Sequence, residues 1–295
     1  MNIVFIGCVE FSAATLRHVL DARLGTVVGV VTRRASPFNA DFVSLEGAAS
    51  SAGIPSFVAE GNDQAAMAEW IAARHPDVIF CFGWSYLLKP GILGLARLGV
   101  VGYHPAALPQ NRGRHPITWA LALGLGRTAS TFFFMDDGAD SGDILSQRFL
   151  EILPSDDAGT LYRRLIAVSL LQLNEFTAQL ASGHFPRTPQ DHSQANVWRK
   201  RGKRDGEVDW RMSAQSIHNL VRALGRPYVG AHCLWAGNEI KIWRTRPADG
   251  RGFENCEPGK VLGHDRSAPI VKCGQDAIVV DEHEFPALPA VGSYL

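Results

Sequence analysis

The sequence predicts an α/β fold, with a Rossmann-like, mostly parallel sheet in a larger N-terminal domain and a smaller C-terminal β-barrel. Three observations lead to this prediction. Short β-branched and aromatic runs alternate with helical stretches in the first half of the chain. A polar, basic, proline-marked stretch then interrupts the pattern, and short strands with glycine turns follow it. The length of 295 residues and the 46% apolar content suit two packed domains.

The N-terminal part begins with residues 2–7 (NIVFIG), a continuous apolar run closed by glycine, as expected for a strand buried on both faces. The next helix is expected from residue 11, with Ser12 as its N-cap. Alternation of this kind favours parallel strands covered by helices on both faces. The expected strands are 2–7, 26–32, 55–58, 77–82, 99–103, 130–135 and 143–151, and the expected helices are 11–20, 45–52, 65–74, 116–123 and 160–182.

The composition changes after the long helix, where prolines, histidines and a basic run at 199–204 replace the apolar pattern. We therefore predict a large domain over residues 1–190, a linker over 191–206 and a second domain over 207–295. The second domain should hold a helix at 213–224 and strands at 230–235, 239–243, 259–262, 270–273 and 277–281. An exposed edge of this small sheet could support a homodimer.

Charge and cysteine usage limit the classes of partner. The 29 basic and 29 acidic residues balance, whereas proteins that grip nucleic-acid phosphates usually carry a basic surplus. The five cysteines are scattered and odd in number, which favours reduced thiols and a cytoplasmic setting. The start of the sequence contains no secretory signal, and no apolar run approaches the roughly 20 residues of a membrane helix, so we expect no membrane partner.

His104 is the first candidate for catalysis. It follows the expected strand 99–103 and opens a polar loop, and ligands of open α/β sheets bind beyond the carboxyl ends of strands. Imidazole also exchanges protons near physiological pH. Asp140 is the second candidate, because it lies in an acidic stretch between two expected strands, and a carboxylate beside a histidine orients its ring. A packed histidine and an ordinary Asp-Ser-Gly turn are the structural alternatives.

Several common chemistries lack their sequence markers. The first strand is followed by Gly7 and Cys8 without the second and third glycines of a dinucleotide fingerprint. The P-loop, the G-x-S-x-G elbow and the H-E-x-x-H zinc motif are also missing from the sequence. The ten histidines show no spacing suited to a metal ion, and we expect none to be bound.

Motifs spread over almost the whole chain resemble those of the N10-formyltetrahydrofolate-dependent formyltransferase family. The opening MNIVFIGCVEF is similar to the family's first strand and turn, HPAALPQNRG to its histidine loop and GADSGDIL to its aspartate loop. DGEVDW, IHNLVRALGRPYVGAH and KIW resemble the family's C-terminal oligonucleotide-binding-like (OB-like) domain. Separate motifs in the same order are far more specific than any one of them alone.

The resemblance implies formyl transfer from N10-formyltetrahydrofolate, the co-substrate, to a primary amine. His104 would stabilise the negative charge that develops on the formyl oxygen, and Asp140 would orient His104 and help remove the amine proton. The family's usual Asn two residues before the histidine is replaced by Gly102, and Asn111 is a candidate to supply the missing amide. The folate site implied by the resemblance comprises Phe82, Trp84, Tyr86, Leu87 and Leu88, with Asp137 and Gly138 on the opposite wall.

The sequence leaves several alternatives for the substrate that receives the formyl group. We rank a nucleotide-linked amino sugar first, because the neutral charge weighs against tRNA and the Arg-Gly-Arg-His-Pro run at 112–116 resembles the sugar-modifying branch. Methionyl-tRNA formyltransferase comes second. A formyltetrahydrofolate hydrolase, favoured by Gly102, and a folate-binding protein without catalysis complete the alternatives.

Overall fold

The computed structural model describes residues 1–36 and 39–295 and divides the chain into two compact units. The first unit comprises Met1–Pro116, Thr128–Leu150 and Arg163–Trp198, and the second comprises Ile117–Arg127, Glu151–Tyr162 and Arg199–Leu295. The last passage between them, at Trp198 and Arg199, falls inside the stretch expected as a linker. Two earlier segments, Ile117–Arg127 and Glu151–Tyr162, also belong to the second unit, and nothing in their sequence predicts this. The domain borders given in the sequence analysis stay predictions.

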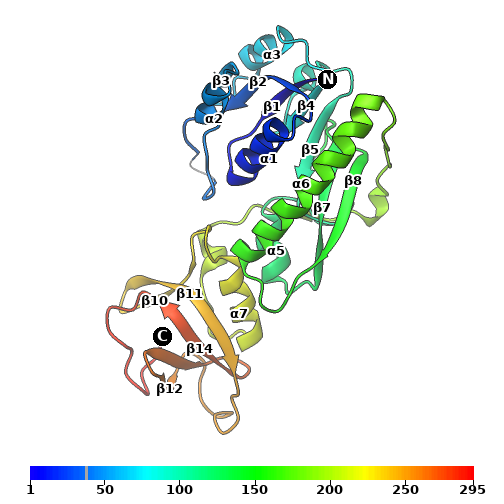
Figure 1. Ribbon diagram of the computed structural model, residues 1–295. Coiled ribbons are helices and arrows are strands. Elements are labelled where there is room, and N and C mark those ends of the chain that lie inside the picture. Colours follow the sequence, from blue (N-terminus) through cyan, green and yellow to red (C-terminus); the bar gives the residue numbers. More distant parts are fainter. Residues whose placement is uncertain (37–38) are drawn as a thin grey trace. The chain divides into compact units, whose positions relative to one another are not determined.

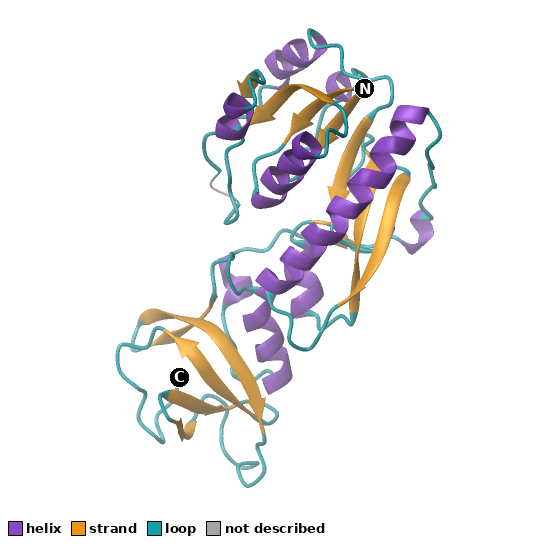
Figure 2. Ribbon diagram, in the orientation of Figure 1, coloured by secondary structure: helices purple, strands orange, loops and turns teal. Residues whose placement is uncertain are grey.

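The first unit is built on a seven-stranded sheet in the order β3-β2-β1-β4-β5-β7-β8 (Figures 1 and 2). Strands β3, β2, β1, β4 and β5 run parallel, and β7 is antiparallel to β5. The mostly parallel sheet expected from the sequence is therefore confirmed. The strand bounds are β1 Asn2–Ile6, β2 Thr26–Thr32, β3 Ser56–Val58, β4 Val78–Cys81, β5 Val100–His104, β7 Arg127–Phe134 and β8 Ile144–Glu151.

Helices cover both faces of this sheet. On one face, Ile6 and Ile79 pack in a buried cluster with Met67 and Ile71 of α3. On the other face the sheet presents phenylalanines, and Phe80 contacts Phe176 of α6 at a ring-centroid distance of 6.0 Å. The helices and their bounds are α1 Glu10–Asp21, α2 Glu46–Ser51, α3 Gln64–Ala72, α4 Pro90–Leu93, α5 Pro116–Ala122 and α6 Ala158–Ser182.

Ser12 does not cap α1, contrary to the sequence prediction. The helix already begins at Glu10, so Ser12 lies in its first turn. Its hydroxyl accepts a hydrogen bond from the main-chain N of Val9 at 3.1 Å and donates one to the carbonyl of Phe82 at 2.6 Å. Ser12 therefore ties the turn after β1 to the carboxyl end of β4, the edge at which the candidate site lies.

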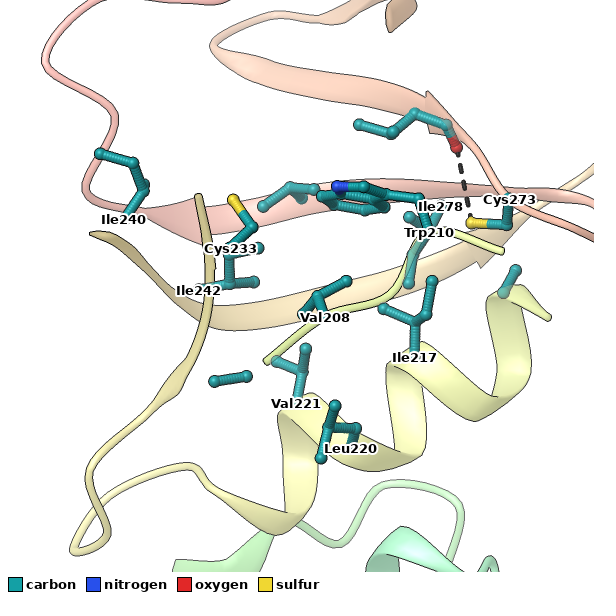
Figure 3. Packing of buried hydrophobic residues seen from close by; sticks show 14 of the residues in the cluster. Val208, Trp210, Ile217, Leu220, Val221, Cys233, Ile240, Ile242, Cys273 and Ile278 are labelled. Atoms are coloured by element: carbon teal, nitrogen blue, oxygen red, sulfur yellow. Dashed lines mark hydrogen bonds between the residues drawn. The ribbon is translucent and has the colours of Figure 1, made fainter. Parts of the chain in front are cut away.

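The second unit contains an antiparallel sheet in the order β10-β11-β14-β13-β12 and the helix α7 (Ala214–Ala223). Figure 3 shows Ile217 and Val221 of α7 facing the buried side chains of the sheet, and Leu220 belongs to the same buried cluster. A separate antiparallel sheet is thus confirmed, whereas its closure into an OB-like barrel stays a prediction. The strand bounds are β10 Ala231–Trp235, β11 Asn238–Ala248, β12 Val261–Asp265, β13 Ala268–Lys272 and β14 Ala277–His283.

Buried thiols make the second unit sensitive to alkaline pH. Burial raises the pKa of Cys233 and of Cys273 to about 12 each, so the folded chain keeps protons that the unfolded chain releases from about pH 8.5 upward. Their contribution to stability is complete below that pH and is lost as pH rises toward 12, by at most about 1.4 kcal/mol per pH unit for each thiol. The urea midpoint should therefore fall less steeply between pH 8 and pH 10.5 in Cys233→Ala than in the parent. Equal slopes would contradict this assignment.

Among the described residues, none of the helices combines the length and apolar character that crossing a bilayer requires.

Candidate active site

His104 ends β5 and is 4% exposed. Its Nε2 lies 2.7 Å from the main-chain carbonyl oxygen of Asn111. Because a carbonyl oxygen only accepts hydrogen bonds, this nitrogen carries the proton of the ring. The other ring nitrogen, Nδ1, faces Oδ2 of Asp140 at 3.6 Å. The structure therefore brings together all three residues that the sequence analysis names as catalytic.

Asp140 lies in the turn between β7 and β8, in the left-handed backbone region with φ of 55°. Its Oδ2 accepts a hydrogen bond from the main-chain N of Gly113 at 2.9 Å. The turn itself is ordered by Asp136, whose Oδ1 accepts from the N of Gly138 at 3.0 Å and from the hydroxyl of Ser141 at 2.6 Å. The carboxylate thus faces an imidazole nitrogen from a fixed backbone, and a proton added to Nδ1 would lie between two acceptors.

Asn111 contributes to the site through its main chain. Its carbonyl holds His104, and its N–H donates to Oδ1 of Asn196 at 2.8 Å. Like Asp140, it has a left-handed backbone, with φ of 65°. That the Asn111 side-chain amide donates a hydrogen bond to the formyl oxygen, in place of the family's usual asparagine, stays a prediction.

Gly102 leaves no room for a side chain in the present packing. A Cβ atom built at this position would lie 2.9 Å from Cγ of Met135 and 3.0 Å from Cζ of Phe133. Side chains of β7 and the turn after it thus occupy the space beside Gly102. An asparagine at this position would require both neighbours to shift.

Gly113 allows two short strands to pair beside His104. Strand β6 (Arg112–Gly113) runs parallel to β9 (Val197–Trp198), and the sequence analysis predicts neither. Gly113 has φ of 99°, and a Cβ atom there would lie 2.3 Å from the carbonyl oxygen of Trp198. Only glycine fits this close approach, which also directs the Gly113 N–H to Asp140.

Replacing Gly113 by alanine is expected to lower stability by about 1–3 kcal/mol and to reduce turnover, because the strained backbone and the clash displace the loop. Urea denaturation and steady-state kinetics would measure the two effects. Gly47→Ala is the matched control, since Gly47 is exposed in α2 with open space around it. A Gly113→Ala variant as stable and active as that control would contradict the explanation.

The predicted folate-binding residues at 82–88 fall into two groups. Phe82 and Leu88 are buried in the core, and both main-chain groups of Phe82 are bonded within the protein, to Ile6 and Ser12. Leu87 is exposed, and its carbonyl accepts a hydrogen bond from Nε2 of the buried Gln64 at 2.8 Å. The side chains at 84–86 are half-buried and that of Leu87 is exposed, so they are more accessible than those of Phe82 and Leu88.

Trp84 and Tyr86 form an aromatic pair with Arg33, a residue that the sequence analysis passes over. The Arg33 guanidinium lies 4.8 Å from the Trp84 ring centroid and 4.2 Å from that of Tyr86. Arg33 Nε and Trp84 Nε1 are buried without a hydrogen-bond acceptor among the described residues. Two inward-facing donors on flat, cationic and aromatic surfaces suit a planar polar ligand.

Arg114 connects this aromatic segment to the histidine loop, because its Nη1 donates to the carbonyl of Ser85 at 2.8 Å. Asp137 and Gly138 lie exposed in the same turn as Asp140. Direct contacts therefore link the loops after β4 and β5 with the turn after β7.

Burial raises the pKa of Cys8, in the turn after β1, to about 11, so this thiol stays protonated at physiological pH. Within residues 1–36 and 39–295, no group of three or more His, Cys, Asp or Glu side chains is arranged to hold a metal ion.

Comparisons with known proteins match both parts of the chain. Residues 1–171 match the family model described as formyl transferase, and residues 200–291 match the model described as formyl transferase, C-terminal domain. Among solved structures, the chain is similar to WlaRD, a sugar 3N-formyl transferase crystallised with dTDP and 5-N-formyl-THF. That likeness has 15% identity, covers 95% of this chain and 96% of WlaRD, and has a TM-score of 0.70.

Two further structures share the fold. The N-formyltransferase from Helicobacter canadensis, in complex with folinic acid and dTDP-3-aminofucose, is 14% identical over 94% of this chain and 98% of its own, with a TM-score of 0.70. HypX from Aquifex aeolicus, in complex with tetrahydrofolic acid, is 17% identical over 95% of this chain, with a TM-score of 0.67. This chain spans only 43% of the length of HypX.

Proposed function

Because the chain belongs to the formyl transferase family, we propose that it transfers a formyl group from N10-formyltetrahydrofolate to the amino group of a nucleotide-linked amino deoxysugar. The observation that carries the proposal is the buried His104, held by a carbonyl on one side and facing Asp140 on the other. The relatives solved with a formyl-folate and a dTDP-sugar or dTDP support the choice of substrates.

The reaction replaces the bond between the formyl carbon and N10 of the folate by a bond to the acceptor nitrogen. One proton leaves that nitrogen, and one is needed at N10. Nδ1 of His104 and the Asp140 carboxylate form a pair of acceptors that can take up the proton from the acceptor nitrogen and return it to N10 as the bond to the folate breaks. The resulting imidazolium, in a site sheltered from water, would stabilise negative charge on the formyl oxygen.

The segment at 84–87 is the proposed wall for the pterin ring. Beside Trp84 and Tyr86, Arg33 Nε and Trp84 Nε1 have no hydrogen-bond acceptor among the described residues, and the aromatic faces match a flat heterocycle with acceptor nitrogens. The exposed Asp137 and Gly138 form the proposed opposite wall. These residues would bind and orient the folate, while His104 and Asp140 act on the transferred group.

The experiment that tests the proposal measures tetrahydrofolate release from N10-formyltetrahydrofolate by absorbance. It compares reactions without acceptor, with dTDP- and UDP-linked 3-amino and 4-amino sugars, and with charged initiator tRNA. Release only with an amino sugar supports the proposal. Release only with tRNA would make tRNA the acceptor in place of a sugar. Equal release in every reaction would indicate hydrolysis, the alternative that Gly102 favours.

A cytoplasmic setting and a homodimer stay predictions. The five cysteines, each in the described part of the chain, are free thiols, which supports a reducing setting.

A further inference from the structure

Residues 188–198, here called the strap, follow α6 and contact both loops of the catalytic pair. At one end, Thr188 exchanges two main-chain hydrogen bonds with Ile144, of 2.8 and 3.0 Å. At the other end, β9 pairs with β6 beside His104. The strap therefore touches the aspartate turn and the histidine loop, although most of it falls within the stretch that the sequence analysis treats as a linker.

Gln190 is the strap's contact with the aspartate turn. Its side chain is 6% exposed, and its Nε2 donates to the carbonyl of Asp140 at 3.0 Å and to that of Gly142 at 2.6 Å. Its Oε1 accepts a hydrogen bond from Nη2 of the buried Arg112 at 2.6 Å. Every donor and acceptor used by this amide thus points to a loop that carries a catalytic residue.

Asn196 is the corresponding contact with the histidine loop. Its Oδ1 accepts from the N–H of Asn111 at 2.8 Å, and its carbonyl accepts from the N–H of Arg112 at 3.0 Å. Asn111 in turn holds His104 through its own carbonyl. Gln190 therefore bonds the main chain of Asp140 itself, and Asn196 bonds the main chain of Asn111, which in turn holds His104.

The two anchored residues share an uncommon conformation. Asn111 and Asp140 both have a left-handed backbone, which costs free energy in residues other than glycine and persists where neighbouring groups impose it. The strap supplies a hydrogen bond to the main chain of each. Small rotations at these positions would change the distance of 3.6 Å between Nδ1 of His104 and Oδ2 of Asp140.

We propose that Gln190 and Asn196 are positioning residues that set the separation of His104 and Asp140. The proposal rests on the proposed function for its kinetic consequences but not for its structural ones. Neither side chain touches a reacting atom, so both act through the main chain of Asp140 and Asn111. A misplacement of about 1 Å in a catalytic group can lower a rate by about 100-fold.

The kinetic test uses four variants of the full chain. Gln190→Ala and Asn196→Ala should lower kcat about 10- to 100-fold with the KM for the folate changed less than about twofold. Asn196→Asp keeps the acceptor for the Asn111 N–H and should restore kcat to within about threefold of the parent. Gln194→Ala is the control, because this strap residue is exposed and its side chain makes no hydrogen bond to either loop among the described residues. An Asn196→Asp variant as slow as Asn196→Ala, or unchanged kcat in both alanine variants, would overturn the proposal.

A structural readout separates this proposal from the proposed function. Hydrogen exchange of the Gly113 amide reports the hydrogen bond to Asp140 without any turnover. Faster exchange at Gly113 in Gln190→Ala, with unchanged exchange in the strands β1 and β4, supports the strap even if the parent proves inactive with the folate. Unchanged exchange at Gly113 would overturn the proposal even if the parent is a formyltransferase.

Discussion

Replacing His104 by glutamine is expected to lower kcat about 100- to 1000-fold, because the variant loses the group that takes up a proton and stabilises charge on the formyl oxygen. The glutamine amide can still donate to the Asn111 carbonyl, so the loop should keep its conformation. The KM for the folate should change little, since His104 acts on the transferred group and not on the pterin. Steady-state kinetics with the best acceptor would measure both constants.

The control for this experiment is His184→Gln, because His184 is an exposed histidine whose Nδ1 lies 3.0 Å from the carbonyl oxygen of Ser182 in its own turn. It should leave kcat within about twofold. Equal activity of the His104→Gln variant and the parent would show that His104 has no role in catalysis. A loss of kcat in His104→Gln that is accompanied by a lower urea midpoint would show that the substitution acts by destabilising the fold.

Replacing Asp140 by asparagine should lower kcat about 100- to 10,000-fold, within the range of a lost acid–base contribution. The change keeps the size of the side chain and an oxygen that accepts from the Gly113 N–H. The same Oδ2 atom accepts from Gly113 and faces Nδ1 of His104, so an asparagine oxygen there removes the negative charge that would stabilise a proton on Nδ1. Kinetics at a fixed pH, with the hydrogen exchange of the Gly113 amide as a check of geometry, would test this.

Asp21→Asn serves as the matched control, since Asp21 is an exposed carboxylate at the end of α1. It should change neither kcat nor stability measurably. If the Asp140→Asn variant kept at least a third of the parent's kcat with normal exchange at Gly113, the charge of Asp140 would have no role in catalysis.

The sequence was sufficient to predict the main elements of the sheet because their signals are local. The runs at 2–7 and 26–32 are continuous and apolar, as strands buried on both faces require, and both strands are present. His104 could be predicted for the same reason, since the end of a parallel strand marks where ligands bind. Ser12 was misassigned because α1 begins at Glu10 without a side-chain cap, which leaves no start signal in the sequence.

The remaining parts of the site depend on contacts between distant segments. Strands β6 and β9 have two residues each, too few for any periodic pattern. Gln190 reaches the main chain of Asp140 across 50 positions, and a single polar residue after Pro189 gives no hint of such a bond. Arg33 likewise shows its role only through its position beside Trp84 and Tyr86. Spacing along a chain cannot predict which buried side chain meets which loop.

The most direct test of the central claim follows the formyl carbon itself. The protein would be incubated with N10-formyltetrahydrofolate labelled with carbon-13 in the formyl group and with the acceptor that gives the fastest folate release, and carbon-13 NMR would report where the label goes. The account predicts a formamide signal on the sugar nitrogen, formed by the parent and slowed at least about 100-fold in the His104→Gln variant. Label appearing as free formate at the same rate with and without acceptor would contradict it.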